Sequence, residues 1–304
     1  MSVPSSCASC GVAENDDIKL SKCTTCDLAL YCSDACQELH RPEHELACKK
    51  RAAEIRDELL FKQPESTHLG DCPICLLPFS TNTETVTMMA CCSKSICHGC
   101  DYAINLYETE QSLEPTCPFC RHPIPEGVDL NVNVKKRLAV DDPVAIRQMG
   151  LICINTVEGT GDERFYSKAV EYLTKAAGLG DAEAHYQLSI FLSEGQAVEK
   201  DEEKELYHLE EAAIGGHPNA RYNLGCIEAI IGRFDRAVKH FIIAANLGEV
   251  DSLHALRRCY VDGHINKKDF AAALRAHQAA VDATKSPQRE AAEARRNTYQ
   301  NTDS

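Results

Sequence analysis

Residues 7–48 read CASCGVAENDDIKLSKCTTCDLALYCSDACQELHRPEHELAC, and the spacing of the cysteines decides how this stretch folds. The candidate ligands form four closely spaced pairs: Cys7 and Cys10, Cys23 and Cys26, Cys32 and Cys36, His44 and Cys48. A spacer of two or three residues lets one turn direct both side chains of a pair at one ion. Thiolate and imidazole are ligands that zinc prefers, so these pairs predict two tetrahedral zinc sites.

A second group of eight thiols follows, and it predicts two more zinc ions. Its members are Cys72, Cys75, Cys91, Cys92, Cys97, Cys100, Cys117 and Cys120. We therefore expect four zinc ions in two fingers, because segments this small hardly fold without metal. Cys91 and Cys92 are adjacent, which is an awkward arrangement for holding one ion. His98 is the alternative ligand to Cys91, and otherwise it is a solvated loop residue.

The distribution of cysteine divides the chain. Of 18 cysteines in 304 residues, only Cys153, Cys226 and Cys259 lie beyond Cys120, and we expect these three to be core residues. The beginning of the chain has neither the basic nor the apolar segment of a secretory signal, and no stretch is long enough for a transmembrane segment. We therefore expect a cytoplasmic or nuclear location, where paired cysteines bind metal and disulfides do not persist.

The charge of the chain bears on its partners. The formal net charge is −14, which repels a polyphosphate bound mainly through charge. A protein partner is expected, and neither a membrane nor nucleic acid. DNA binding through the fingers is a weaker alternative, because a basic stripe is missing.

The first finger, residues 7–48, resembles the MYND-type zinc finger in its ligand order and in Tyr31 and Gln37. The resemblance implies interleaved sites, with one ion on Cys7, Cys10, Cys32 and Cys36 and the other on Cys23, Cys26, His44 and Cys48. MYND fingers are typically peptide-docking modules, and a tryptophan helps to build their docking surface. This chain has Arg41 at that position and no tryptophan. Peptide binding by this finger therefore stays open.

The second finger, residues 72–121, resembles an all-cysteine variant of the RING finger. The resemblance implies a cross-braced scheme, with Cys72, Cys75, Cys97 and Cys100 on one ion and Cys91, Cys92, Cys117 and Cys120 on the other. The common RING pattern has a histidine three residues before the fifth ligand. Lys94 occupies that position here, and it is no ligand while protonated.

Four further residues acquire roles from the RING resemblance. In RING ubiquitin ligases, the positions of Ile74, Ile104 and Pro118 form a groove for the ubiquitin-conjugating enzyme, and that of Arg121 contacts the donor ubiquitin. In the alternative interpretation, Ile74 and Ile104 are packing residues and Pro118 shapes a loop. A RING has no nucleophile of its own and acts by positioning a charged thioester, so no catalytic residue is expected.

A repeat begins near Asp142. Pairs of alanines recur at 36, 32 and 35 residues: Ala176-Ala177, Ala212-Ala213, Ala244-Ala245 and Ala279-Ala280. The first three pairs are followed by a glycine that can end a helix, so the pattern predicts that each repeat is a helical hairpin. Stacked hairpins form a solenoid. The pattern resembles Sel-one-like repeats, relatives of the tetratricopeptide class, which usually bind protein. A weaker first unit begins near Val144, and we expect a long loop between its helices at residues 155–163.

The predicted fold class is multidomain, with two small zinc-stapled fingers followed by an all-α solenoid. The expected parts are a MYND-type finger (7–48), a helical linker (49–70), a RING-type finger (72–121), a linker (122–141), Sel-one-like repeats (142–284) and a polar, partly disordered tail (285–304). The predicted function is that of a RING-type ubiquitin ligase, with the substrate protein on the solenoid and the first finger. The alternative is a non-catalytic scaffold. Lys94 and the adjacent thiols favour the scaffold, whereas Ile74, Pro118 and Arg121 favour the ligase.

Overall fold

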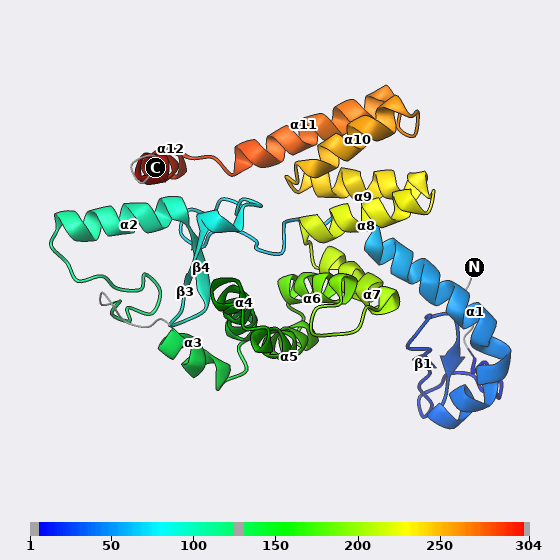
Figure 1. The fold of residues 1–304 in the computed structure, drawn as a ribbon. Helices are drawn as coiled ribbons and strands as arrows, with labels where there is room; N and C mark the ends of the chain where they lie inside the picture. Colours follow the sequence, from blue (N-terminus) through cyan, green and yellow to red (C-terminus); the bar gives the residue numbers. More distant parts are fainter. Residues whose placement is uncertain (1–5, 125–130, 301–304) are drawn as a thin grey trace. The chain divides into compact units, whose positions relative to one another are not determined.

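The computed structural model describes residues 6–124 and 131–300, and the chain divides after Lys62 into two compact units (Figure 1). Within the described ranges, none of the helices combines the length and the apolar character that crossing a membrane requires.

The first unit contains the first finger and one long helix. Strands β1 (Ser21–Lys22) and β2 (Leu30–Tyr31) pair antiparallel, and helix α1 (Asp34–Leu60) follows. The hydroxyl of Ser33 caps α1 by accepting a hydrogen bond from the Cys36 N–H at 3.3 Å. The helical part of the predicted linker is thus continuous with the helix that carries the last ligands of the finger. Tyr31 is buried among the cysteines.

The second finger opens the second unit. A 3-10 turn (Thr83–Thr85) leads into strands β3 (Val86–Met89) and β4 (Lys94–Cys97), which pair antiparallel with Val86 opposite Cys97, and helix α2 (His98–Glu110) follows. The Cys97 side chain caps α2 by accepting from the Cys100 N–H. Phe79 and Ile96 form the core together with buried cysteines.

The segment expected as a linker at 122–141 contains helix α3 (Asn131–Leu138). Val134 of this helix is buried with Ala90 of the finger and Ala145 of the repeat region. This part of the segment is therefore packed between the two structures that it joins.

The repeat region consists of helical hairpins (Figure 1). Its helices are α4 (Pro143–Thr160), α5 (Arg164–Gly178), α6 (Ala182–Glu194), α7 (Glu202–Ile214), α8 (Pro218–Ile230), α9 (Phe234–Asn246), α10 (Asp251–Val261) and α11 (Lys267–Ala283). Ala176, Ala212 and Ala244 are fully buried, because small side chains let neighbouring helices approach closely. The fold is the predicted all-helical solenoid behind cysteine-rich fingers.

One expectation for this region is corrected. The loop predicted at residues 155–163 is mostly helix, because α4 continues to Thr160 and ends at Gly161, whose φ of 71° is left-handed. The tail after residue 285, expected to be polar and partly disordered, contains helix α12 (Pro287–Gln300). Ala292 of α12 is buried, so tertiary packing outweighs the polar composition. Residues 301–304 lie outside the described residues.

Candidate metal centres and the surface of the second finger

The eight candidate ligands of the first finger lie in two groups of four. One group contains Cys7, Cys10, Cys32 and Cys36, and the other contains Cys23, Cys26, His44 and Cys48. In the first group Sγ of Cys32 lies 3.5 Å from that of Cys10 and 3.6 Å from that of Cys36. In the second, Cys26 Sγ lies 3.1 Å from His44 Nε2. The groups have the interleaved membership that the resemblance implied.

A recurring turn positions the cysteine pairs. The residue after the second cysteine is left-handed in four of them, namely Gly11, Asp27, Leu76 and Arg121, with φ between 57° and 76°. Its N–H donates to the carbonyl of the first cysteine, as from Arg121 to Cys117 at 2.9 Å. This turn brings both thiols of a pair to the same side, where they can share an ion.

The thiols of the second finger also form two groups of four. Cys72, Cys75, Cys97 and Cys100 make up one, and Cys91, Cys92, Cys117 and Cys120 the other. Sγ–Sγ distances across the first are 3.8 Å for Cys72 to Cys100 and 3.8 Å for Cys75 to Cys97. Across the second they are 3.7 Å for Cys92 to Cys117 and 3.3 Å for Cys91 to Cys120.

The turn after β3 explains how adjacent cysteines reach one group. Ser93 is left-handed, with φ 59°, and its N–H donates to the Met89 carbonyl at 2.8 Å. This is the turn found at the other pairs, with Met89 in the first position and Cys92 in the second. Cys91 therefore projects from the middle of the turn to Cys120. His98 belongs to none of the ligand groups found in the described ranges, and it lines a hollow next to α12.

The local electrostatics of the turns lower the thiol pKa at one cysteine in each group, whereas burial and neighbouring thiols raise the pKa of others, such as Cys91 and Cys100. Backbone N–H groups, above all that of Cys10, lower the pKa of the Cys7 thiol to about 6. Burial raises the pKa of Cys117, but the N–H groups of Cys120 and Phe119 outweigh this effect and bring it to about 7. Thiols that are already inclined to ionise lose less free energy when a metal displaces their protons.

The donor sets and distances of all four groups fit zinc. Three groups offer four sulfurs and one offers three sulfurs and an imidazole, which are typical sets of structural zinc sites. A Zn–S bond of about 2.3 Å implies a sulfur–sulfur edge of about 3.8 Å in a tetrahedron, close to the distances observed. The chain is a zinc-binding protein with sites for several ions.

A further group, His68, Glu183 and His217, has another character. Both Nε2 atoms approach Glu183 Oε2, at 3.3 Å from His68 and 3.0 Å from His217. The Ala220 N–H donates to His217 Nδ1, so His217 carries its proton on Nε2 and donates it to Glu183. The two rings lie 15° from parallel, and both contact Glu183. These contacts hold the three side chains together as a polar cluster.

The four non-ligand residues predicted in the second finger lie at its surface. Ile74 is 43% exposed in the first ligand loop, and Pro118 and Arg121 are exposed in the last. Ile104 is half-buried on α2. Ile104 and Pro118 line one hollow of about 480 Å³, whereas Ile74 is not among its lining residues.

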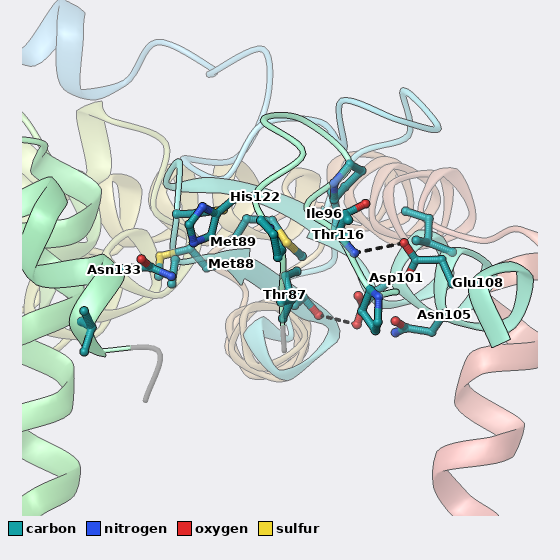
Figure 2. Close-up of a pocket in the computed structure, with 18 of the residues that line it drawn as sticks. Thr87, Met88, Met89, Ile96, Asp101, Asn105, Glu108, Thr116, His122 and Asn133 are labelled. Carbon is teal, nitrogen blue, oxygen red and sulfur yellow. Dashed lines mark hydrogen bonds between the residues drawn. The ribbon is translucent and has the colours of Figure 1, made fainter. Parts of the chain in front are cut away.

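Sequence reasoning missed much of this hollow, which Figure 2 shows between the hairpin β3–β4, helix α2 and the last ligand loop. Met88 and Met89 supply part of its apolar lining. Two hydrogen bonds tie its walls together: Thr87 Oγ1 donates to Asp101 at 3.1 Å, and the Thr116 N–H donates to Glu108 at 3.1 Å. The apolar run of β3 was the available signal, but its pairing partner was not apparent from the sequence.

The fold and its sites together define a zinc-finger protein with a helical-repeat solenoid. Comparison with known families makes this specific. Residues 7–48 match the MYND finger, and residues 145–181, 182–217 and 218–249 match the Sel1 repeat. The first finger is thus a MYND finger and residues 145–249 of the solenoid are Sel1 repeats, a combination that indicates a protein-interaction adaptor.

The solved structures that are similar to this chain include a Sel1 repeat protein and a protein described as displaying an SLR fold. One is a Sel1 repeat protein from Oxalobacter formigenes, with 25% identity and a TM-score of 0.43, covering 60% of this chain and 71% of that one. The other is a protective antigen present in uropathogenic Escherichia coli strains, described as displaying an SLR fold. It has 21% identity and a TM-score of 0.40, covering 65% of this chain and 39% of the antigen. Among curated proteins, none matches the chain.

Proposed function

We propose that the second finger is a RING-type finger that recruits a charged ubiquitin-conjugating enzyme, so that the chain acts as a ubiquitin ligase. Its substrate protein is held by the Sel1 repeats and the MYND finger. The observation that carries the proposal is the pairing of the thiols: the first and third pairs share one group, and the second and fourth share the other. This is the cross-braced order of a RING. In two successive fingers, the first and second pairs would share one ion and the third and fourth pairs the other.

The surface residues give the proposed finger its chemistry. Ile104 and Pro118 present apolar atoms on one hollow, and the exposed Ile74 adds an apolar side chain in the first ligand loop. These side chains would bind the conjugating enzyme by burying apolar surface. Arg121, exposed beside the last ligand, would hold the donor ubiquitin in one orientation. Zinc supplies the rigid cross-brace, and the attacking lysine comes from the substrate, so the finger acts by positioning alone.

The test is lysine discharge from conjugating enzymes that have been charged with ubiquitin beforehand. The wild-type protein should accelerate discharge from at least one enzyme in a broad panel. Ile104→Ala should weaken recruitment about tenfold, because truncating an interface anchor costs about 1–3 kcal/mol. Leu106→Ala is the matched control, since Leu106 is exposed two residues further along α2 and so on a different face of the helix.

Arg121 separates binding from positioning. Because Arg121 is left-handed, with φ 57°, asparagine is a suitable replacement, since it tolerates this backbone better than most other side chains. Arg121→Asn should leave enzyme binding unchanged and slow discharge. Binding is measured by titration with the uncharged enzyme, and zinc content is checked for every variant.

The second candidate function is an adaptor whose second finger recruits no enzyme. One observation favours it: the Lys94 ammonium lies over the Phe119 ring, 5.0 Å from its centroid, at the position where the common RING pattern has a ligand histidine. If the wild-type protein accelerates discharge from no enzyme in the panel, the adaptor is the correct assignment.

A further inference from the structure

The C-terminal helix α12 lies directly against the second finger (72–121), although residues 122–286 lie between them in the sequence. Figure 1 shows α12 nearly end-on next to α2, and the two helices are in contact. The approach is close at Gly99, where a Cβ would lie 2.7 Å from the Arg289 backbone nitrogen. Gly99 lies between the ligands Cys97 and Cys100. A glycine at this position therefore lets the backbone of α12 reach the first ligand group.

Arg289 extends from α12 into the first ligand loop. One Nη atom donates to the carbonyls of Pro78, at 2.6 Å, and Thr284, at 2.7 Å. The other donates to the Leu77 carbonyl at 3.2 Å and to Cys75 Sγ at 3.4 Å. One guanidinium thus joins the end of the solenoid, the loop behind Cys75 and a ligand sulfur.

The charge of this contact suits a metal centre. A zinc ion with four thiolates carries a net charge of −2, and sulfur in such a group accepts hydrogen bonds. Arginine stays protonated at any pH that a zinc site survives, and its planar fork can serve several acceptors at once. A cation at 3.4 Å from Cys75 Sγ offsets part of the negative charge of the group and shields that sulfur from solvent on one side.

We propose that Arg289 is a retention residue for the zinc of the Cys72, Cys75, Cys97 and Cys100 site, and that α12 is a structural part of the second finger. The solenoid then does more than bind a partner. By holding α12 in place, it holds the guanidinium on the metal centre, so zinc retention depends on the far end of the chain. This proposal does not depend on ligase activity.

The experiment follows zinc release from the full-length, zinc-loaded protein into excess chelator near neutral pH. Losing an outer partner of a metal ligand typically lowers metal affinity about 10–100-fold. Arg289→Gln should therefore lose one zinc at least about tenfold faster than wild type, while the other ions stay. Native mass spectrometry counts the ions, and cysteine alkylation with peptide mapping identifies the site. Cys72, Cys75, Cys97 and Cys100 should react first.

Three further variants separate the effect of the Arg289 contact from other effects on zinc release. Arg289→Lys retains the charge but not the fork, and its release rate should fall between those of wild type and Arg289→Gln. Gly99→Ala changes no charge and no ligand but pushes α12 away, so it should also accelerate release. Arg296→Gln is the matched control, because Arg296 is on the same helix and pairs with Glu84 of the finger, which belongs to none of the ligand groups found in the described residues.

The proposal is overturned if Arg289→Gln and Gly99→Ala both release zinc at the wild-type rate. It is equally overturned if Arg296→Gln accelerates release as much as Arg289→Gln, or if alkylation shows that zinc leaves another site first. Circular dichroism checks that the solenoid remains folded in every variant, so a change in release is not mistaken for general unfolding.

Discussion

The imidazole rings of His68 and His217 are stacked, with 4.3 Å between their centroids. His68 precedes the second finger, and His217 caps helix α8 of the solenoid. The backbone N–H of His68 also donates to the backbone carbonyl of Gly216 at 3.1 Å. The segment that enters the second finger is thus fastened to the second repeat through a buried contact, with Glu183 shared between the two rings.

This contact should make stability depend on pH. Burial lowers the pKa of His217 in the folded state, so the unfolded chain takes up its proton first as pH falls. The stability that the neutral ring contributes is complete above about pH 6.5 and is lost below it. Glu183 acts in the same direction: burial opposes its ionisation, but His217 and His68 hold its pKa well below the usual range. Its contribution is lost at lower pH, below about 4.3.

His217→Asn tests this dependence, because asparagine retains the helix cap without titrating. Urea unfolding of zinc-loaded protein, compared between about pH 7.5 and about pH 5.5, should show a smaller loss of stability in the variant than in wild type. At the higher pH the free energy of unfolding of the variant should be about 1–2 kcal/mol lower than that of wild type, because buried contacts are lost. His254→Asn, at a mostly exposed solenoid position, should retain the wild-type dependence. Equal pH dependence in His217→Asn and wild type would show that His217 does not titrate as argued.

The sequence predicted those parts of this structure that local spacing encodes. Cysteine pairs and alanine–glycine helix ends are signals carried by a few neighbouring residues, and they revealed both fingers and the hairpins. The turn at Met89 that brings Cys91 into its group was not apparent, because its first position lacks a cysteine. The Arg289 contact was hidden for another reason. It joins residues 214 positions apart, and no local pattern records such a pairing.

Cys91 and His98 give opposite predictions for zinc content. Cys91 Sγ lies 3.3 Å from Cys120 Sγ, whereas His98 faces α12, so Cys91→Ser should lower the count of bound zinc from four to three. His98→Gln should retain all four. Native mass spectrometry of freshly purified protein provides the count. If His98→Gln lost one zinc and Cys91→Ser kept four, His98 would be the ligand and Cys91 would not.

A close contact within the solenoid predicts a strong effect of one methyl group. A Cβ on Gly225 of α8 would lie 2.5 Å from Cε1 of Phe241 on α9, a distance that real side chains do not tolerate. Gly225→Ala should therefore force the two helices apart and cost about 1–3 kcal/mol, measured as a lower midpoint in urea. Gly159→Ala is the matched control: it also lies in a helix, nothing lies within 4 Å of its added Cβ, and it should stabilise by up to about 1 kcal/mol.

The last prediction concerns the independence of the solenoid from zinc. Two core clusters of the solenoid consist mainly of aliphatic and aromatic side chains such as Leu173 and Phe241, and the four ligand groups contain no residue beyond Cys120. Folding of these helices should therefore need hydrophobic burial and not metal. A fragment spanning residues 142–285, which ends before α12, should show a strongly helical circular dichroism spectrum and cooperative thermal unfolding in the presence of chelator. The fragment 1–124, which contains both fingers, should lose its structure under the same conditions, because its cores are built around thiols. A random-coil spectrum for 142–285 would mean that the repeats require the second finger to fold.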